Sequence, residues 1–323
     1  MIITFTPNPS LDRTIGLSGR LARGEVQRAV SSREEPGGKG VNICRALEAS
    51  GLPSLAILPG DDLDPVLQGL RTAGIPHLGM PIGAAIRSNV AITEPDGTTT
   101  KINVPGPLLS TEQQHALIAL VLEKAEGADW LVLAGSLPPG VPVDFYADIT
   151  RQLRARYGAA APKVAVDSSG APLAAAVTAA PDLIKPNGEE LAELTGIPDA
   201  DALEADPALV ARASERLVAA GVGAVLATLG ASGAVLVTAA GAWLAQTPPM
   251  IATSTVGAGD SSLAGFLLST IAGASAPDSL RQAAAHGAAA ASLPGSTVPA
   301  LNQTRPGDVT VTSLVTHPKE DVQ

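Results

Sequence analysis

Short runs of Val, Ile and Leu recur along the chain, and stretches with helical patterning lie between several of them. The apolar runs are MIITFTP, SLAILPG, DWLVLAG, PKVAVDSS, DLIKPN and GAVLATLG. The helical stretches are residues 41–50, 62–74, 111–126, 142–157, 188–195 and 207–220. Because continuous apolar strands that alternate with helices are typical of sheets covered on both faces, the pattern predicts an α/β fold with a mostly parallel central sheet.

Two segments, residues 13–35 and 87–104, depart from this pattern by alternating small apolar and polar residues. The second contains Asp96-Gly97 between two alternating runs, which is a hairpin signal. A sheet with one solvated face produces this alternation, so the two segments predict a small β-sheet lid beside the α/β body. We therefore expect residues 1–314 to form one domain with the lid segments inserted, and residues 315–323 to form a flexible tail.

Residues 217–245 contain no Asp, Glu, Lys or Arg, and a membrane span needs about 20 apolar residues. Five glycines interrupt this segment, with Ser and Thr between them. Such frequent glycines favour two short buried strands joined by a turn, rather than a membrane helix.

Composition excludes several kinds of partner. The net charge is −10 and aromatic residues make up 2% of the chain. Neither a basic field nor stacking platforms are available, so we expect no nucleic acid and no membrane as partners. The single cysteine, Cys44, cannot form an internal disulfide, and the first residues lack the pattern of a signal peptide. Both observations favour a cytoplasmic protein.

The segment TSTVGAGDSS places Gly257, Ala258 and Gly259 directly before Asp260 and an apolar run. At the start of a helix, small residues let an anion approach the free N–H groups. These groups could stabilise a transferred phosphoryl, and Asp260 would lie where an attacking hydroxyl loses its proton. The alternative is a capped helix, with Thr255 as N-cap and Asp260 as a favourable first-turn acid.

The segment PGGKGVN also opens a helix with glycines and adds Lys39 and Asn42. Its spacing is not that of a Walker A loop, since Gly40 follows the lysine. It can still form an anion pocket, with Lys39 as a point charge and Asn42 as a partner for sugar hydroxyls. The alternative is a glycine turn with a solvated lysine.

Five blocks follow one another in order: TPNPSLD at 6–12, PGGKGVN at 36–42, GSLPPGV at 135–141, KPNGEEL at 185–191 and VGAGDS at 256–261. Together they resemble the ribokinase-like PfkB carbohydrate kinases, and within that family the bacterial 1-phosphofructokinases and tagatose-6-phosphate kinases. The resemblance covers about residues 1–295 and implies a three-layer sandwich with a β-sheet lid. One departure is Ser254, where many members have Asp.

The resemblance also implies roles for individual residues. Asp260 matches the catalytic base, and Gly257, Ala258 and Gly259 match the anion hole. The matching substrate-side residues are Asp12, Gly38, Lys39, Asn42, Arg87, Lys101, Asn103 and Ser136. The matching ATP-side residues are Lys185, Asn187, Thr228, Gly230 and Gly233, together with residues 257–259.

Glu190 matches the residue that serves Mg²⁺. Magnesium prefers oxygen ligands and usually keeps several waters, so a single carboxylate that acts through water is sufficient. The alternative for KPNGEEL is a helix start at Asn187 with first-turn acids. His286, in a helix expected near the adenine, is interpreted as a packed or surface residue without a catalytic role.

A sugar phosphate brings a second phosphate and needs further cations, for which Arg87, Lys101 and Lys39 are the candidates and Arg28 a weaker one. The alternative for each lid cation is a solvated surface charge. The sequence therefore predicts ATP-dependent phosphorylation of a ketohexose phosphate, with D-fructose 1-phosphate favoured. Alternatives are a tagatose-6-phosphate kinase, a 6-phosphofructokinase and a catalytically silent sugar-phosphate sensor. Exposed sheet edges on the lid, together with the resemblance, predict a homodimer through the lids.

Overall fold

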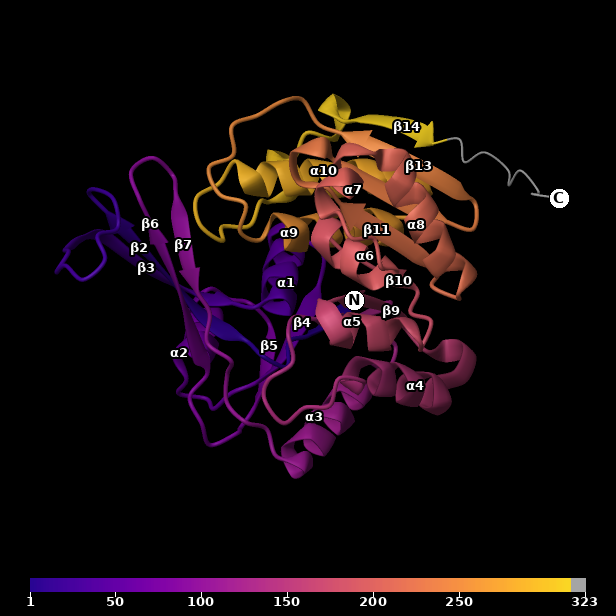
Figure 1. The fold of residues 1–323 in the computed structure, drawn as a ribbon. Coiled ribbons are helices and arrows are strands. Elements are labelled where there is room, and N and C mark those ends of the chain that lie inside the picture. The colour runs from indigo at the N-terminus through magenta and orange to yellow at the C-terminus, as the bar shows by residue number, and fades with distance from the viewer. Residues whose placement is uncertain (315–323) are drawn as a thin grey trace.

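The computed structural model describes residues 1–314, which form two sheets (Figure 1). The larger sheet has the strand order β14-β13-β12-β11-β10-β9-β8-β1-β4-β5. Its parallel strands are β1 (Ile2–Phe5), β4 (Ser54–Pro59), β5 (His77–Met80), β8 (Trp130–Ala134), β9 (Lys163–Asp167), β10 (Leu183–Ile184) and β11 (Ala224–Thr228). Its antiparallel strands are β12 (Ala234–Thr238), β13 (Gly241–Gln246) and β14 (Thr310–Leu314).

Helices cover both faces of this sheet. One layer holds α3 (Thr111–Lys124), α4 (Phe145–Tyr157), α5 (Gly170–Val177), α6 (Gly188–Thr195), α7 (Ala200–Ala205) and α8 (Pro207–Ala219). The other holds α1 (Lys39–Ala49), α9 (Ala258–Ile271) and α10 (Ala276–Ala291), with α2 (Pro65–Thr72) in an adjoining cluster. Successive strand residues point to opposite layers, as Trp130 and Leu131 do, so both faces of the sheet are apolar. The three-layer α/β fold predicted from the sequence is confirmed.

The smaller sheet is the lid, which lies on the left of Figure 1. Its order is β3 (Ala29–Gly37), β2 (Ser10–Leu17), β6 (Arg87–Thr93) and β7 (Thr99–Ile102). β2 pairs with β3 and β6 with β7 in antiparallel fashion, whereas β2 and β6 run parallel. The turn between β6 and β7 places Gly97 at φ 90°, which explains the glycine of the Asp96-Gly97 signal.

The six predicted helices are present with ends shifted by a few residues. The sequence patterns did not predict four short elements: α5, α7, β5 and β14. Residues 217–245 contain the predicted pair of buried strands, β11 and β12, which are antiparallel. Within residues 1–314, no helix has the length and apolarity needed to cross a membrane. The predicted tail, residues 315–323, lies outside the described residues.

Candidate active site

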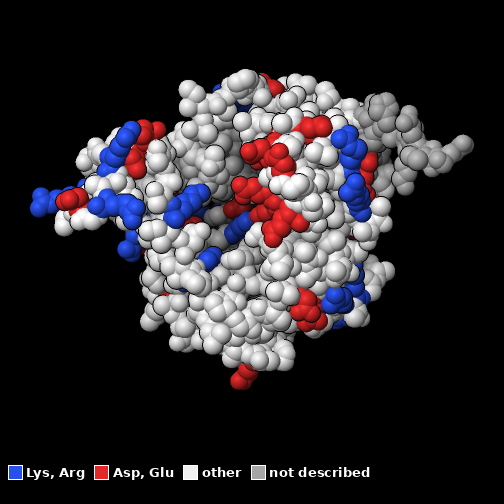
Figure 2. Space-filling model, viewed as in Figure 1, with Lys and Arg blue, Asp and Glu red and all other residues white. Residues whose placement is uncertain are grey.

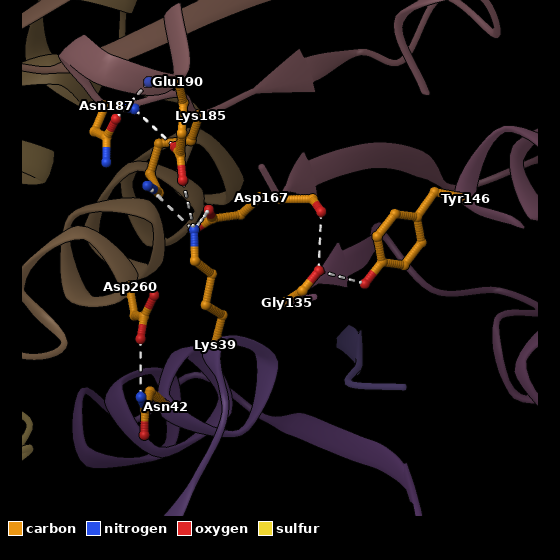
Figure 3. A network of polar contacts seen from close by, with 10 residues as sticks. Lys39, Asn42, Gly135, Tyr146, Asp167, Lys185, Asn187, Glu190 and Asp260 are labelled. Atoms are coloured by element: carbon orange, nitrogen blue, oxygen red, sulfur yellow. Dashed lines mark hydrogen bonds and ion pairs between the residues drawn. The ribbon is translucent and has the colours of Figure 1, made fainter. Parts of the chain in front are cut away.

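Chain segments that are far apart in sequence meet at the carboxyl ends of the parallel strands. Asp167 is the last residue of β9, and Lys185 directly follows β10. Lys39 is the first residue of α1, and Asp260 lies in the first turn of α9. Figure 3 shows these side chains converging on one another. In open α/β sheets this edge is where ligands bind, so the site lies where the topology predicts.

The start of α9 is free to receive an anion. Gly257 is its N-cap, with φ 75° and no side-chain cap, so Thr255 does not cap the helix as the alternative proposed. The first N–H groups of a helix have no intrahelical acceptors. Gly257 and Gly259 add no side chain over them. The Ala258 N–H contacts the carbonyl oxygen of Thr255 at 3.4 Å, so the turn offers the N–H groups of Gly259 and Asp260 as its free donors, at the positive end of a helix.

The carboxylate of Asp260 is buried beside this turn, with 7% of the residue exposed. Asn42 donates from Nδ2 to its Oδ2 at 2.8 Å. Burial, together with the nearby charge of Asp167, raises the pKa of Asp260 to about 6, while Lys39, Asn42 and Lys185 oppose the rise. A carboxylate with a pKa near neutrality is suited to accept a proton from a hydroxyl.

Asp167 is the centre of the charged network, and the sequence analysis did not identify it. It is fully buried, and its Oδ1 and Oδ2 lie 2.6 and 3.1 Å from the ammonium groups of Lys39 and Lys185. Burial acts to raise the pKa of Asp167, but the two ammonium groups outweigh it and hold the pKa below its ordinary value. An acid that ends the apolar run PKVAVDSS of a parallel strand was the available signal.

Lys39 lies close to carboxylates from three different segments of the chain. Its Nζ also contacts Glu190 Oε1, at 3.4 Å. Burial opposes its charged form, but Asp167, Glu190 and Asp260 raise its pKa above the ordinary value. Lys39 therefore stays an ammonium, with 33% of its side chain exposed, and its expected contact with the sugar phosphate stays a prediction. Asn42 faces Asp260, and its expected contact with a sugar hydroxyl also stays a prediction.

Asn187 and Glu190 form a reciprocal cap at the start of α6. Asn187 Oδ1 accepts from the Glu190 N–H at 2.7 Å, and Glu190 Oε2 accepts from the Asn187 N–H at 2.9 Å. The structural alternative for KPNGEEL is thus present. It leaves Glu190 Oε1 with Lys39 as its contact and with lone pairs to spare. No group of three or more His, Cys, Asp or Glu in residues 1–314 could hold a metal by itself.

The nucleotide-side loop follows β11. Thr228 ends this strand and pairs with Asn187, which joins the loop to the cap of α6. Gly230 opens the turn that leads to Gly233, where φ is 105° and a Cβ would lie 2.1 Å from the carbonyl oxygen of Ala245. Beyond the hairpin that follows lies a cavity of about 390 Å³. It is bounded by residues 247–250, the C-terminal half of α10 and residues 303–309.

A second cavity, of about 210 Å³, lies under the lid. Asp12, Lys101 and Asn103 line it, together with Val256 and residues 295–296 of the body. Burial raises the pKa of Asp12, and hydrogen bonds from Ser10 and Asn89 oppose the rise. We call this space the lid cavity.

Three other residues that were predicted to bind substrate contact the chain segments near the lid cavity. The guanidinium of Arg87 donates to the carbonyl oxygens of Asn8, Pro9 and Val104. Ser136 accepts from the Asn8 amide at 3.1 Å. Gly38 has φ 110°, and a Cβ there would lie 2.8 Å from the methyl of Thr6, so only glycine allows this close approach of α1 to β1.

This combination of a doubly covered parallel sheet, a β lid, a helix start with free N–H groups and a buried carboxylate beside it defines an α/β phosphotransferase of the sugar-kinase class. Residues 7–303 match the description "pfkB family carbohydrate kinase". The chain belongs to this family of kinases.

Known relatives agree with this assignment. A 1-phosphofructokinase of Rhodobacter capsulatus is 34% identical over 88% of this chain and 88% of its own length. A 1-phosphofructokinase of Escherichia coli K12 is 32% identical over 90% of this chain and 91% of its own length. The crystal structure of phosphofructokinase-2 from Escherichia coli in complex with potassium has a TM-score of 0.83 and 29% identity. It covers 94% of this chain and 96% of that one. The family and fold inferred from the five sequence blocks are confirmed.

Proposed function

We propose that this protein transfers the γ-phosphoryl group of ATP to a ketohexose phosphate, and that D-fructose 1-phosphate is converted to fructose 1,6-bisphosphate. The observation that carries the proposal is the pairing of Asp260 with the free N–H groups of its own helix start. The carboxylate receives the proton of the attacking hydroxyl, and the N–H groups of residues 258–260 stabilise the charge on the transferred phosphoryl.

The two lysines act on the donor side. Lys185 Nζ lies 3.2 Å from where a Cβ on Gly259 would be, so its ammonium lies beside the turn that receives the phosphoryl group. Asp167 fixes this ammonium and that of Lys39, and neither lysine needs to reorient as the reaction proceeds. Preorganised charges in a buried site stabilise a phosphoryl group during its transfer more effectively than mobile charges do.

Glu190 fits a role with Mg²⁺. Its Oε1 can accept a hydrogen bond from a metal-bound water while Oε2 stays committed to the cap. Bound together with ATP, the ion would neutralise phosphate charge. We propose further that the adenine occupies the 390 Å³ cavity beyond the Gly230–Gly233 loop.

The charge distribution supports a phosphorylated acceptor. Figure 2 shows Lys and Arg gathered on the lid side, opposite a group of acidic residues over α6 and α7. Lys101 has no ion-pair partner among the described residues and faces the lid cavity, where it can meet a phosphate that a plain sugar lacks. The relatives named 1-phosphofructokinase favour fructose 1-phosphate. The match to phosphofructokinase-2 keeps a 6-phosphorylated ketohexose as the second candidate.

A substrate panel tests the proposal. ADP release is measured with fructose 1-phosphate, fructose 6-phosphate, tagatose 6-phosphate and fructose at equal concentration with Mg-ATP. We expect the highest kcat/KM for fructose 1-phosphate, and a tenfold or greater loss for it in Lys101→Met, on the order of one charge-assisted hydrogen bond. A preference for unphosphorylated fructose would contradict the assignment of Lys101.

Asp260→Asn separates an enzyme from a sugar-phosphate sensor. If Asp260 is the base, the variant binds the sugar phosphate in calorimetry but loses turnover by about 10³-fold or more. A sensor would show negligible turnover in both proteins. We also propose that the protein forms a homodimer through the lids.

A further inference from the structure

Three segments meet beside Asn42, on the side away from Asp260. They are the inner end of β3, the middle of α1 and the segment after α10. Arg45 of α1 joins them: its Nη2 lies 3.5 Å from Glu35 Oε1, and its Nη1 contacts the carbonyl oxygens of Pro36 and Ser296 at 3.3 and 3.4 Å. Ser296 in turn donates to Glu35 Oε2 at 3.0 Å.

The same guanidinium reaches the residue that holds the catalytic carboxylate. Arg45 Nη1 lies 3.4 Å from Asn42 Oδ1, while Asn42 Nδ2 donates to Asp260 Oδ2 at 2.8 Å. The amide of Asn42 therefore has a cation at its oxygen end and a carboxylate at its nitrogen end. Arg45 and Glu35 are themselves mostly buried, with 15% and 18% of their side chains exposed, so solvent screens this chain of contacts only in part.

The orientation of that amide matters for the chemistry. An asparagine can present either a donor or an acceptor to its neighbour. Presented as a donor, it stabilises the ionised form of Asp260. Turned by 180°, it would accept from the protonated form and favour the acid that cannot act as a base. Arg45 can only donate, so it binds the oxygen end and leaves the NH₂ end for Asp260.

Glu35 connects the lid to the contacts that join Arg45, Asn42 and Asp260. It lies opposite Asp12 in the lid sheet, and β3 continues into α1 through Gly37 and Gly38. A movement of the inner end of β3 would carry Glu35 away from Arg45 and Ser296. The guanidinium would then lose the anion that fixes it over Asn42.

We propose that Arg45 is a positioning residue for the kinase reaction, which links the inner end of the lid, through Glu35, to the orientation of Asn42 and so to the ionised state of Asp260. The inference rests on the proposed function, in which Asp260 is the base. The charged groups that face Asp260 from other elements are Asp167 of β9, Lys39 of α1 and Lys185 after β10, and all three remain in place in the variants below.

The test compares Arg45→Met and Arg45→Lys with the unaltered enzyme, with kcat and KM measured across pH 5–9. We expect Arg45→Met to lower kcat at pH 6.5 by about tenfold, since hydrogen bonds to charged groups have effects of this order. We expect KM for fructose 1-phosphate to change less than threefold. The acid limb of the kcat profile should move to higher pH. Arg45→Lys keeps a donor at the site and should recover part of the loss.

Two further variants separate a positioning role from a structural one. Glu35→Gln should move the acid limb in the same direction as Arg45→Met. Its neighbour Glu34, paired with Arg13 on the lid, provides the matched control, and Glu34→Gln should leave the profile unchanged. In an Asn42→Ala background, Arg45→Met should move the acid limb no further, because its effect passes through Asn42.

The outcomes are distinct. An Arg45→Met enzyme with normal thermal stability and an unshifted acid limb overturns the inference, as does a shift that persists in the Asn42→Ala background. If Arg45→Met does not fold, Glu35→Gln and Arg45→Lys decide by the same criterion. If Asp260→Asn retains turnover, the proposed function itself fails. Loss of turnover in Asp260→Asn with a wild-type profile in Arg45→Met rejects the positioning role alone.

Discussion

At the scale of single residues, the site depends on one buried carboxylate that two lysines share. Asp167 is fully buried and meets Lys39 and Lys185 from opposite segments of the chain. Breaking a buried ion pair leaves charges uncompensated, and such changes have large effects. Asp167 also raises the pKa of Asp260 through its own negative charge. In the proposed mechanism it therefore affects both the donor side and the base.

We expect Asp167→Asn to act in two ways. The kcat value should fall by about tenfold or more, because Lys39 and Lys185 lose the anion that holds them. The acid limb of the remaining activity should move to lower pH, because the neutral amide no longer raises the pKa of Asp260. Both are read from a pH profile of kcat. Asp201→Asn, on the exposed start of α7, is the control.

A second residue-scale prediction concerns pH directly. A base must be ionised to accept a proton, and the pKa of Asp260 is raised to about 6. Activity should therefore be fully present above this pH and decline as the pH falls through it. The measurement is kcat/KM from pH 4.5 to 9, which reports on the free enzyme. An acid limb near the ordinary value of aspartate, 3.8, would contradict the environment described for Asp260.

At the scale of elements, helix starts position the chemistry. A glycine N-cap precedes both α1 and α9, and the two helices pack against each other; α9 carries free N–H groups and the proposed base, Asp260, on one turn. The two glycines before Asp260 have different constraints. Gly257 needs a positive φ, whereas Gly259 has ordinary helical geometry and lies against the ammonium of Lys185.

Replacing these two glycines should produce different defects. Gly259→Ala should keep or slightly raise stability, because alanine favours a helix by about 1 kcal/mol. Its turnover should fall, since the new Cβ would lie 3.2 Å from Lys185 Nζ, in the space proposed for the phosphoryl group. Gly257→Ala should lower stability by about 1–2 kcal/mol through its left-handed backbone. Denaturant unfolding and steady-state kinetics on both variants check the contrast.

α10 carries a buried histidine, His286, that contacts both α9 and the end of α1. Its Nε2 contacts Ser50 at the end of α1, its Nδ1 lies 3.1 Å from the Gln282 carbonyl, and its ring fills the space left by Gly265 of α9. Burial lowers the pKa of His286 below its ordinary value. The interpretation of His286 as a packed residue agrees with these contacts.

The sign of its effect on stability follows from linkage. The unfolded chain binds the proton more readily than the folded protein. His286 therefore contributes stability above its unfolded pKa of about 6.5, and this contribution is lost as the pH falls. Thermal denaturation between pH 8 and pH 5 should show a steeper loss for the unaltered protein than for His286→Leu. His115→Gln, at an exposed site on α3, should behave like the unaltered protein.

At the scale of the whole molecule, the lid has two faces with different properties. Asp12, Asn89 and Asn103 occupy one pleat and line the lid cavity. Ile102, which follows Lys101 and precedes Asn103, lies on the opposite pleat from them and is 54% exposed. An exposed apolar side chain on a sheet with free edges is suited to contact a second copy.

The proposed dimer can be tested on this outer face. Ile102→Glu should shift the protein toward monomer in analytical ultracentrifugation, because it places a charge in an apolar contact. Leu108→Glu is the matched control: Leu108 is 71% exposed and lies outside the lid strands. If neither change alters the sedimentation coefficient of a dimer, the lids are not the interface.

Several features of this protein were determined by sequence order alone. The alternation of apolar runs with helical stretches fixed the α/β class, because continuous apolar strands must be covered on both faces. The Asp96-Gly97 turn and its alternating flanks identified the lid. The glycines at 257 and 259, followed by Asp260, identified a helix start that can receive an anion.

Tertiary structure decided the partners of the charged groups. Asp167 was not identified because its role depends on Lys39 and Lys185, which lie 128 residues before it and 18 residues after it and meet it only through strand order. The contacts of Lys39 with Asp167 and of Asn42 with Asp260 likewise appear only in the fold, while the expected contacts of both residues with the sugar stay predictions. The strength of a charge interaction depends on distance and burial, and a linear sequence contains neither quantity for residues on different strands.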